Sequence, residues 1–170
     1  MQGLIKRPPP VFDASRGLLH NEHFQIAYVT SDIAEAEAVF RRRFGVTSLR
    51  ETEIDMPGGA HLSIRAVWIG GILYEIISGS GPGMELYTSY CAPEGFTLRL
   101  HHLGFLVPDE DSWAALQREV ARGGWTVRSL SDTPGHVRAM HVAAEELGHL
   151  LEFVFPSPAF LKVLEGTPVA

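Results

Sequence analysis

Two short apolar segments each carry one glutamate, and this pair constrains the fold more than any other feature of the sequence. Residues 71–77 contain Glu75, and residues 148–154 contain Glu152, 77 positions later. Because the side chains of a strand alternate between its two faces, each glutamate shares a face with aliphatic residues. An unpaired carboxylate is costly to bury in such surroundings. Two such strands indicate one shared partner, and a bound cation is the simplest.

The offset of 77 recurs at the start of each half of the chain. Residues 25–32 (QIAYVTSD) align with residues 102–109 (HLGFLVPD), so that Gln25 matches His102. Both segments have the pattern of a strand that leads into a helix start. Hydrophobic alternation then predicts three strands in each half, the first of which is expected at about residues 46–53. Since an internal repeat limits the folds available to a chain, we predict an α+β protein built from two tandem βαβββ modules.

These modules divide the chain into five parts. The predicted parts are an N-terminal arm (1–20), a first module (21–78), a linker or flap (79–97), a second module (98–156) and a C-terminal tail (157–170). The sequence leaves open whether the two modules of one chain pair with each other or with those of a second chain in a homodimer.

Composition excludes several classes of function. The formal net charge of −6 lacks the basic face that a nucleic-acid-binding protein needs. A single cysteine, Cys91, excludes an intrachain disulfide and a cysteine zinc cage. The N-terminus lacks the apolar core of a signal peptide, and no apolar run is long enough to span a bilayer. We therefore expect a cytoplasmic protein that acts on a small molecule without membrane attachment.

The four polar residues in the repeat form a candidate metal-binding set. Gln25, Glu75, His102 and Glu152 offer three oxygens and one imidazole nitrogen, which suit zinc, nickel, cobalt, manganese or iron. Two carboxylates would neutralise one divalent ion and make their burial tolerable. His23 is an alternative to Gln25 as the first ligand, because it precedes Gln25 by two residues and a shift of strand register would bring it to the ion.

Four segments, QIAYVTSD, HHLGFLVPD, GILYEII and GHLLEFV, resemble those of the vicinal oxygen chelate superfamily over about residues 22–156. That superfamily includes glyoxalase I, bleomycin-resistance proteins, methylmalonyl-CoA epimerase and extradiol dioxygenases. The resemblance implies that paired modules curl into an incomplete barrel around one divalent metal. It also implies that the ligands come from the first and last strands of each module, which here gives Gln25, Glu75, His102 and Glu152.

The ligand set is similar to that of glyoxalase I, whereas extradiol enzymes hold iron with two histidines and one glutamate. The polar contacts that glyoxalase I makes with glutathione have no counterpart here, because Val29, Gly79 and Leu98 stand near the positions where polar side chains are expected. Glutathione is therefore doubtful as a cofactor.

The resemblance implies a metal-dependent lyase or isomerase that removes a proton next to a carbonyl and stabilises the enolate on the metal. Glu152 is the expected general base, and Glu75 is expected to return the proton. A non-catalytic, resistance-type binding protein remains an alternative, as does an extradiol-type dioxygenase with His23 in place of Gln25. Side chains expected to contact substrate are His23, His61, His141, Tyr87, Tyr90 and Phe96.

Overall fold

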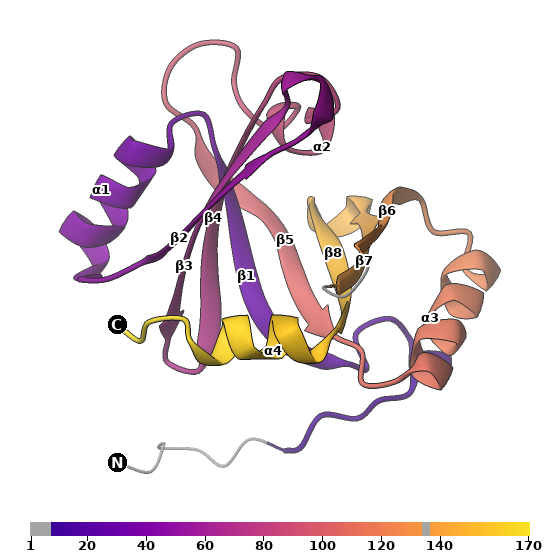
Figure 1. Cartoon of the computed structure of the whole chain (residues 1–170). Coiled ribbons are helices and arrows are strands. Elements are labelled where there is room, and N and C mark those ends of the chain that lie inside the picture. The colour runs from indigo at the N-terminus through magenta and orange to yellow at the C-terminus, as the bar shows by residue number, and fades with distance from the viewer. Residues whose placement is uncertain (1–7, 134–136) are drawn as a thin grey trace.

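The computed structural model describes residues 8–133 and 137–170 of the chain (Figure 1). Its eight strands form one mixed sheet in the order β2-β3-β4-β1-β5-β8-β7-β6. The first half contributes β1 (Glu22–Thr30), β2 (Arg50–Asp55), β3 (His61–Ile69) and β4 (Ile72–Ser80). The second half contributes β5 (Leu98–Leu106), β6 (Val127–Thr133), β7 (Val137–Ala144) and β8 (His149–Pro156). The predicted α+β fold with two βαβββ modules is confirmed.

One helix follows the first strand of each module. α1 (Ile33–Phe44) begins at Asp32, whose carboxylate accepts a hydrogen bond from the Glu35 amide, and ends at Gly45 in the left-handed conformation. α3 (Glu110–Arg122) begins at Asp109 in the same way. α2 (Glu85–Thr88) lies in the linker, and α4 (Pro158–Glu165) follows the last strand. None of the helices among residues 8–133 and 137–170 is long and apolar enough to cross a membrane.

The two modules pair within one chain. β1 and β5 run antiparallel at the centre of the sheet, and each has the last strand of its own module as a parallel neighbour, β4 beside β1 and β8 beside β5. The β1–β5 pairing therefore joins the two modules of this chain into one sheet. The four strands that carry the predicted ligands are consecutive in the sheet, in the order β4-β1-β5-β8.

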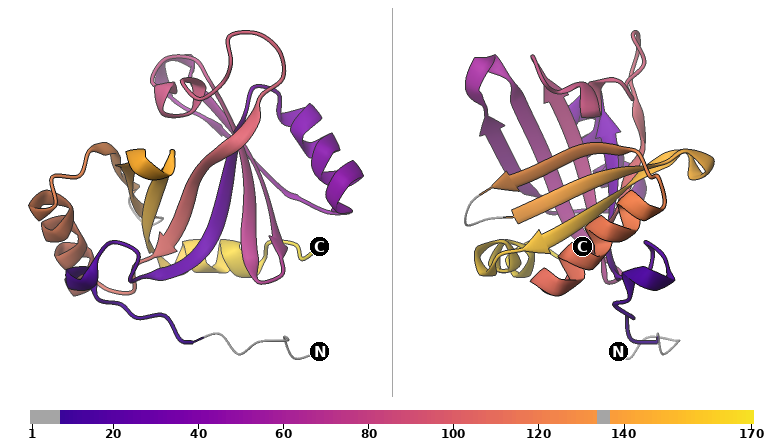
Figure 2. Two further views of the ribbon diagram at one scale, coloured as in Figure 1. Left: turned by 180° about the vertical axis from the view of Figure 1, so that it is seen from behind. Right: turned by 90° about the vertical axis from the view of Figure 1, so that its right-hand side faces the viewer.

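The sheet curls, and its convex side is covered by α1 and α3 (Figure 2). Phe40 of α1 is buried against Val67 and Ile76 of the first half. Trp113 of α3 belongs to a second cluster that includes Phe153. Since each half packs its own helix on the outside, the concave side is left for a site.

Helix α4 covers part of the concave side and ties the C-terminal segment to the first module. Its Leu164 is buried against Phe24 and Leu73, and its Leu164 carbonyl accepts a hydrogen bond from Trp68 Nε1 at 2.9 Å. In Figure 1 this helix crosses in front of the sheet. The tail from residue 157 onward therefore forms one wall of the concave side.

Two segments differ from the sequence-based expectation. Alternation suggested a strand from about residue 46, but β2 begins at Arg50, because Val46 and Leu49 pack into the core beneath α1 instead of pairing. β4 continues through Ser80, past the expected end of the first module at residue 78. The N-terminal arm contacts the body, since Leu18 is buried with the α3 cluster, and residues 1–7 of this arm lie outside the described residues.

Candidate metal centre

The structure brings the four predicted ligand residues to one cavity. Gln25 lies on β1, Glu75 on β4, His102 on β5 and Glu152 on β8, and all four line a cavity of about 490 Å³ on the concave side. Most of the other lining residues are apolar, including Phe160 of α4. The four residues that the 77-residue offset relates therefore lie together in the folded protein.

His102 lies between the two glutamates. Its Nε2 is 3.1 Å from Glu152 Oε2 and 4.0 Å from Glu75 Oε2. The amide of Gln25 donates a hydrogen bond of 2.7 Å to Glu75 Oε2, which joins the fourth residue to the cluster. Ligand atoms around a tetrahedral zinc ion lie roughly 3.3–3.6 Å apart. The observed spacing is close to what an ion among these residues needs.

His141 joins this cluster from β7. His102, His141 and Glu152 each present a ligand atom within 4.8 Å of the others. His141 Nε2 lies 3.5 Å from Glu152 Oε1, because His141 and Glu152 are paired across β7 and β8. The sequence analysis placed His141 among the substrate contacts, and the structure places it directly beside the predicted ligands.

Two compensating β-bulges on β1 and β5 shape this centre. Phe24 is an extra residue on β1, between the pairs His23–Phe105 and Gln25–Gly104. His101 is an extra residue on β5, between the pairs that end at Leu100 and His102. Bulges re-aim side chains and often occur next to functional sites. Here the first separates His23 from the face of Gln25, and the second lets two consecutive histidines lie side by side.

The neighbouring His101 fixes the orientation of His102. His101 Nε2 lies 2.8 Å from the Leu86 carbonyl oxygen, and because a carbonyl only accepts, Nε2 carries the proton. His101 Nδ1 is then an acceptor, and it lies 2.8 Å from His102 Nδ1, which must be the donor. The neutral form of His102 therefore presents an unprotonated Nε2 to the two glutamates.

The unsatisfied polar atoms of this cluster suit a metal ion. Within the described part of the chain, the buried Nε2 atoms of His102 and His141 have no hydrogen-bond partner. His102 Nε2 is close to Glu152 but is not aligned with it for a hydrogen bond. Buried imidazole lone pairs that converge on a carboxylate suit a cation between them. Gln25, Glu75, His102, His141 and Glu152 could thus hold one divalent ion.

Replacing His101 with phenylalanine is expected to weaken metal binding by about 10- to 100-fold, because the ring would still fill the site but could not accept the proton of His102 Nδ1. Titration of the metal-free protein with zinc would measure the loss. A matched control is His149→Phe on β8, whose ring contacts its own strand backbone. An affinity unchanged by His101→Phe would show that His102 does not need this hydrogen bond.

Without a metal ion, burial and the charges of neighbouring residues shift the pKa values of the clustered side chains in different directions. Burial raises the pKa of Glu75 to about 7. Burial also acts to raise the pKa of Glu152, but the positive charge of His102 and the proximity of His141 outweigh it and lower the value to about 2. Burial acts to lower the pKa of His102, but Glu152 and Glu75 raise it overall. Burial lowers the pKa of His141 to about 4.

We expect metal affinity to fall with acidification. The raised pKa of His102 means that its Nε2 is protonated below that value, and this proton must leave before a metal binds. Affinity should therefore be greatest above the pKa values of His102 and Glu75 and fall about tenfold per pH unit for each of these two protons below them, with protons released on binding. Calorimetry in buffers of different ionisation enthalpy would count these protons. Affinity that is constant between about pH 5.5 and 7.5 would contradict this linkage.

Gly104 makes room for Gln25. It is paired with Gln25 on one side and with Glu152 on the other. A Cβ atom at this position would lie 2.5 Å from Gln25 Oε1 and 2.8 Å from Gln25 Cβ, both within van der Waals overlap.

Gly104→Ala is therefore expected to destabilise the protein by about 1–3 kcal/mol, because either Gln25 or the strand must shift. Urea denaturation of the metal-free protein would measure this change. An unaltered midpoint would show that Gln25 can move away at no cost.

The remaining predicted contacts divide into two groups. Tyr87 lines the cavity, and its ring centroid is 5.2 Å from that of His101; Tyr90 packs on the same imidazole at 4.8 Å. Both aromatic residues therefore support the histidine pair. The flap of residues 79–97 thus reaches the centre through these two rings.

The other three candidates lie elsewhere. His23 is exposed, donates a hydrogen bond to the Gln25 carbonyl and packs on Phe105. His61 contacts the carboxylates of Asp55 and Glu53 on the β2–β3 hairpin. Phe96 is 47% exposed. None of these three lines either cavity that reaches the metal centre.

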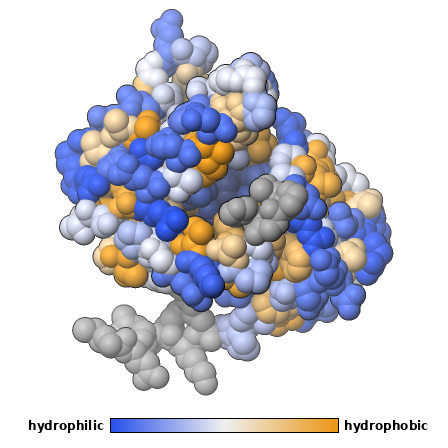
Figure 3. Space-filling model, viewed as in Figure 1, coloured by the Kyte–Doolittle hydropathy of each residue, from blue (hydrophilic) through white to orange (hydrophobic). Residues whose placement is uncertain are grey.

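A second, larger groove meets the first cavity at this centre. It has a volume of about 980 Å³ and lies between the linker around α2 and the strands β6 and β7. Tyr87 and Glu152 line both spaces, whereas His141 faces the groove. Figure 3 shows the corresponding hollow on this face, with hydrophobic and polar residues around it. A substrate could therefore reach Glu152 from the groove.

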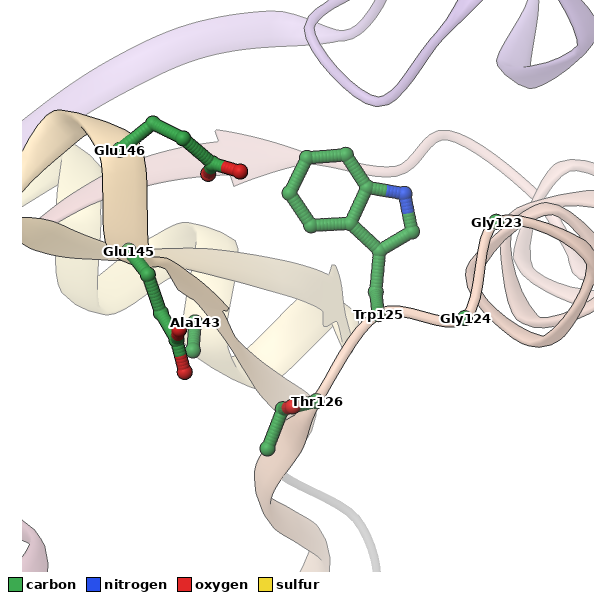
Figure 4. Close-up of a pocket in the computed structure, with 7 residues that line it drawn as sticks. All are labelled: Gly123, Gly124, Trp125, Thr126, Ala143, Glu145 and Glu146. Atoms are coloured by element: carbon green, nitrogen blue, oxygen red, sulfur yellow. The ribbon is translucent and has the colours of Figure 1, made fainter.

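A separate pocket of about 220 Å³ lies on the α3–β6 connection (Figure 4). The indole ring of Trp125 stands beside Glu146, while Glu145 points away from it. This pocket contains none of the predicted ligands, so it plays no part in the metal centre.

The chain belongs to the family described as "Glyoxalase/Bleomycin resistance protein/Dioxygenase superfamily", whose model matches residues 23–153. The predicted family is thereby confirmed. No curated protein matches the sequence significantly.

Similar solved structures include several methylmalonyl-CoA epimerases. The Mycobacterium tuberculosis protein is 16% identical, with a TM-score of 0.56 over 83% of this chain and 91% of that chain. A Streptomyces coelicolor variant in complex with 2-nitronate-propionyl-CoA is 15% identical, with a TM-score of 0.54 over 80% and 97% of the two chains. A methylmalonyl-CoA epimerase in complex with methylmalonyl-CoA and NH4+ is 16% identical, with a TM-score of 0.54 over 81% and 99%. At these identities the similarity establishes the shared fold.

Proposed function

We propose that this protein is a metal-dependent isomerase or lyase that moves a proton on the carbon next to a carbonyl group of a small substrate. The observation that carries the proposal is the pair of partly buried glutamates, Glu75 and Glu152, on either side of His102 in one largely apolar cavity. A divalent ion held by these residues and Gln25 would supply the Lewis acidity that makes such a proton removable. The similar structures of epimerases support proton transfer of this kind.

The two glutamates have different surroundings, which suits two different roles. Glu152 lies against His102 and His141, which favour its ionised form, and it lines both the cavity and the groove. It is therefore the general base that we propose. Glu75 approaches from the other module and accepts a hydrogen bond from Gln25. It is the group that we propose returns the proton, as the acid in a pair whose environments differ.

Exchange of substrate protons with heavy water tests this function whatever the final product is. The metal-loaded protein would be incubated in D₂O with methylmalonyl-CoA, with an α-hydroxyketone and with 2-oxo acids, and the signals of the α-protons followed by NMR. Exchange that depends on the metal is the expected result. Tight binding of these compounds with no exchange would instead identify a non-catalytic binding protein.

A second candidate function rests on the set His102, His141 and Glu152. Two histidines and one carboxylate form the donor set of iron(II) oxygenases. The sequence-based version of this alternative required His23, but the structure places His141 beside the other two residues instead. Loading with iron(II) followed by oxygen uptake with a catechol would support it. Proton exchange with zinc, nickel or manganese and no oxygen uptake would support the first function.

A further inference from the structure

One arginine in the same cavity as the two glutamates has a buried donor that is unsatisfied among the described residues. Arg50, the first residue of β2, lines the cavity of about 490 Å³, and its Nε is buried with no hydrogen-bond partner in the described part of the chain. Arg41, Arg65, Arg122 and Arg138 all form ion pairs. To leave a buried guanidinium N–H unsatisfied costs free energy, so this exception requires an explanation.

The sheet register points Arg50 toward the metal centre. Arg50 is paired with Ala66 on β3, and Ala66 is paired with Glu75 on β4. These three residues form one row across the sheet and all line the cavity. The small side chain of Ala66 leaves space between Arg50 and Glu75. Two strand spacings, about 10 Å, separate the two backbone positions.

The neighbouring helix does not use this guanidinium. A side chain at Gly166, just after α4, would come within 3.9 Å of Arg50 Nη1, so the guanidinium lies near the C-terminal end of the helix. A cation there could in principle satisfy the last carbonyls. The carbonyls of Lys162, Val163 and Leu164, however, already accept hydrogen bonds from the backbone, Thr167 Oγ1 and Trp68 Nε1.

We propose that Arg50 binds a carboxylate group of the substrate, at the end of the molecule away from the reacting carbonyl. This inference rests on the proposed function, because it treats the metal centre as the place of reaction. The planar fork of the guanidinium suits two parallel hydrogen bonds to a carboxylate. Apolar residues such as Leu73 and Phe160 line the space in which the carbon chain between the two ends would lie.

Charge balance favours a carboxylate over a phosphate. Glu75 and Glu152 neutralise one divalent ion, which leaves the single positive charge of Arg50 unmatched. One carboxylate matches that charge. A phosphate dianion would leave excess negative charge in a largely apolar cavity that already contains two carboxylates, and such burial is unfavourable. The substrate class is therefore a small acid that also carries an enolisable carbonyl.

Binding of two matched series of oxo acids to the zinc-loaded protein tests this assignment. The first series carries a single carboxylate, distal to a ketone carbonyl (4-oxopentanoate, 5-oxohexanoate and 6-oxoheptanoate). In the second series a methyl ester replaces that carboxylate, and calorimetry gives the affinity of each compound. At one chain length or more, the acid should bind at least about tenfold more tightly than its ester, as expected for a charge-assisted bidentate pair.

Arg50→Met should abolish this preference and Arg50→Lys should retain part of it, whereas Arg118→Met, at an exposed position on α3, should retain all of it. The melting temperature of Arg50→Met should equal or exceed that of the wild type, because no described contact is lost. No preference at any length, or a preference that survives in Arg50→Met, would overturn the assignment.

The NMR exchange experiment separates this inference from the proposed function. A preference for acids that depends on Arg50, without any exchange of α-protons, would support the carboxylate site and contradict the proposed reaction. Exchange on the esters as readily as on the acids would support the reaction and contradict the site.

Discussion

Glu152→Gln is expected to lower metal-dependent α-proton exchange about a thousandfold while most of the metal stays bound. Glutamine keeps the shape of the side chain and one oxygen that can face the ion, but it cannot accept the proton of the substrate. Glu152 lies against His102 and His141, which favour its ionised form. The measurements are metal content after gel filtration and the rate of exchange in D₂O.

Two other variants complete this experiment. Glu146→Gln, at an exposed position just before β8, changes the same functional group outside the cavity and should leave both measurements unaltered. Glu75→Gln should slow exchange less than Glu152→Gln, since Glu75 is assigned to return the proton. A Glu152→Gln protein with full activity would show that another group is the base. Loss of metal together with activity would show that Glu152 serves mainly as a ligand.

The repeat made most of the architecture predictable from sequence. A common offset of 77 linked Gln25 to His102 and Glu75 to Glu152, and each pair occupies matching strands in the two modules. Because β1 and β5 pair at the centre of the sheet, equivalent positions in the two modules face one another across it. Convergence of the four side chains follows from this symmetry, and strand alternation alone could not have shown it.

The sequence could not show that His101 and His141 lie directly beside His102, although it indicated His141 as a substrate contact. In a regular strand, consecutive residues face opposite sides, so His101 would be directed away from His102. The bulge at His101 breaks this rule, and bulges depend on the pairing of two strands rather than on either sequence alone. The doubled histidine in HHLGFLVPD was the only available signal. His141 likewise depends on the register between β7 and β8.

The position of Arg50 on the edge strand β2 could likewise not be predicted from the sequence. The sequence indicated a strand beginning near residue 46, and in such a strand nothing distinguishes Arg50 from other charged residues. Its relation to Glu75 arises from two successive pairings, through Ala66, that only the folded sheet defines. Local patterns therefore indicated the candidate ligands of the repeat, whereas the position of Arg50 beside them depends on tertiary pairing.

His102→Ala is expected to abolish stabilisation of the protein by divalent metal. A ligand present at one hundred times its dissociation constant stabilises the native state by about 2.7 kcal/mol. For a domain of this size that corresponds to a rise in melting temperature of about 5–10 °C. Because His102 Nε2 lies between Glu75 and Glu152, its removal should leave two carboxylates without the central nitrogen donor, and this rise should disappear. Thermal melts with and without zinc would measure it.

Comparison with two further histidines makes this result specific. His149→Ala removes a partly exposed ring outside the cluster and should leave the rise intact. His141→Ala distinguishes the two ligand sets: a partial loss is expected if Gln25 and Glu75 complete the site, and a loss as large as that of His102→Ala is expected if His102, His141 and Glu152 hold the ion by themselves. A His102→Ala protein that zinc still stabilises fully would place the ion elsewhere, and the proposed proton transfer between Glu152 and Glu75 would lose its electrostatic basis.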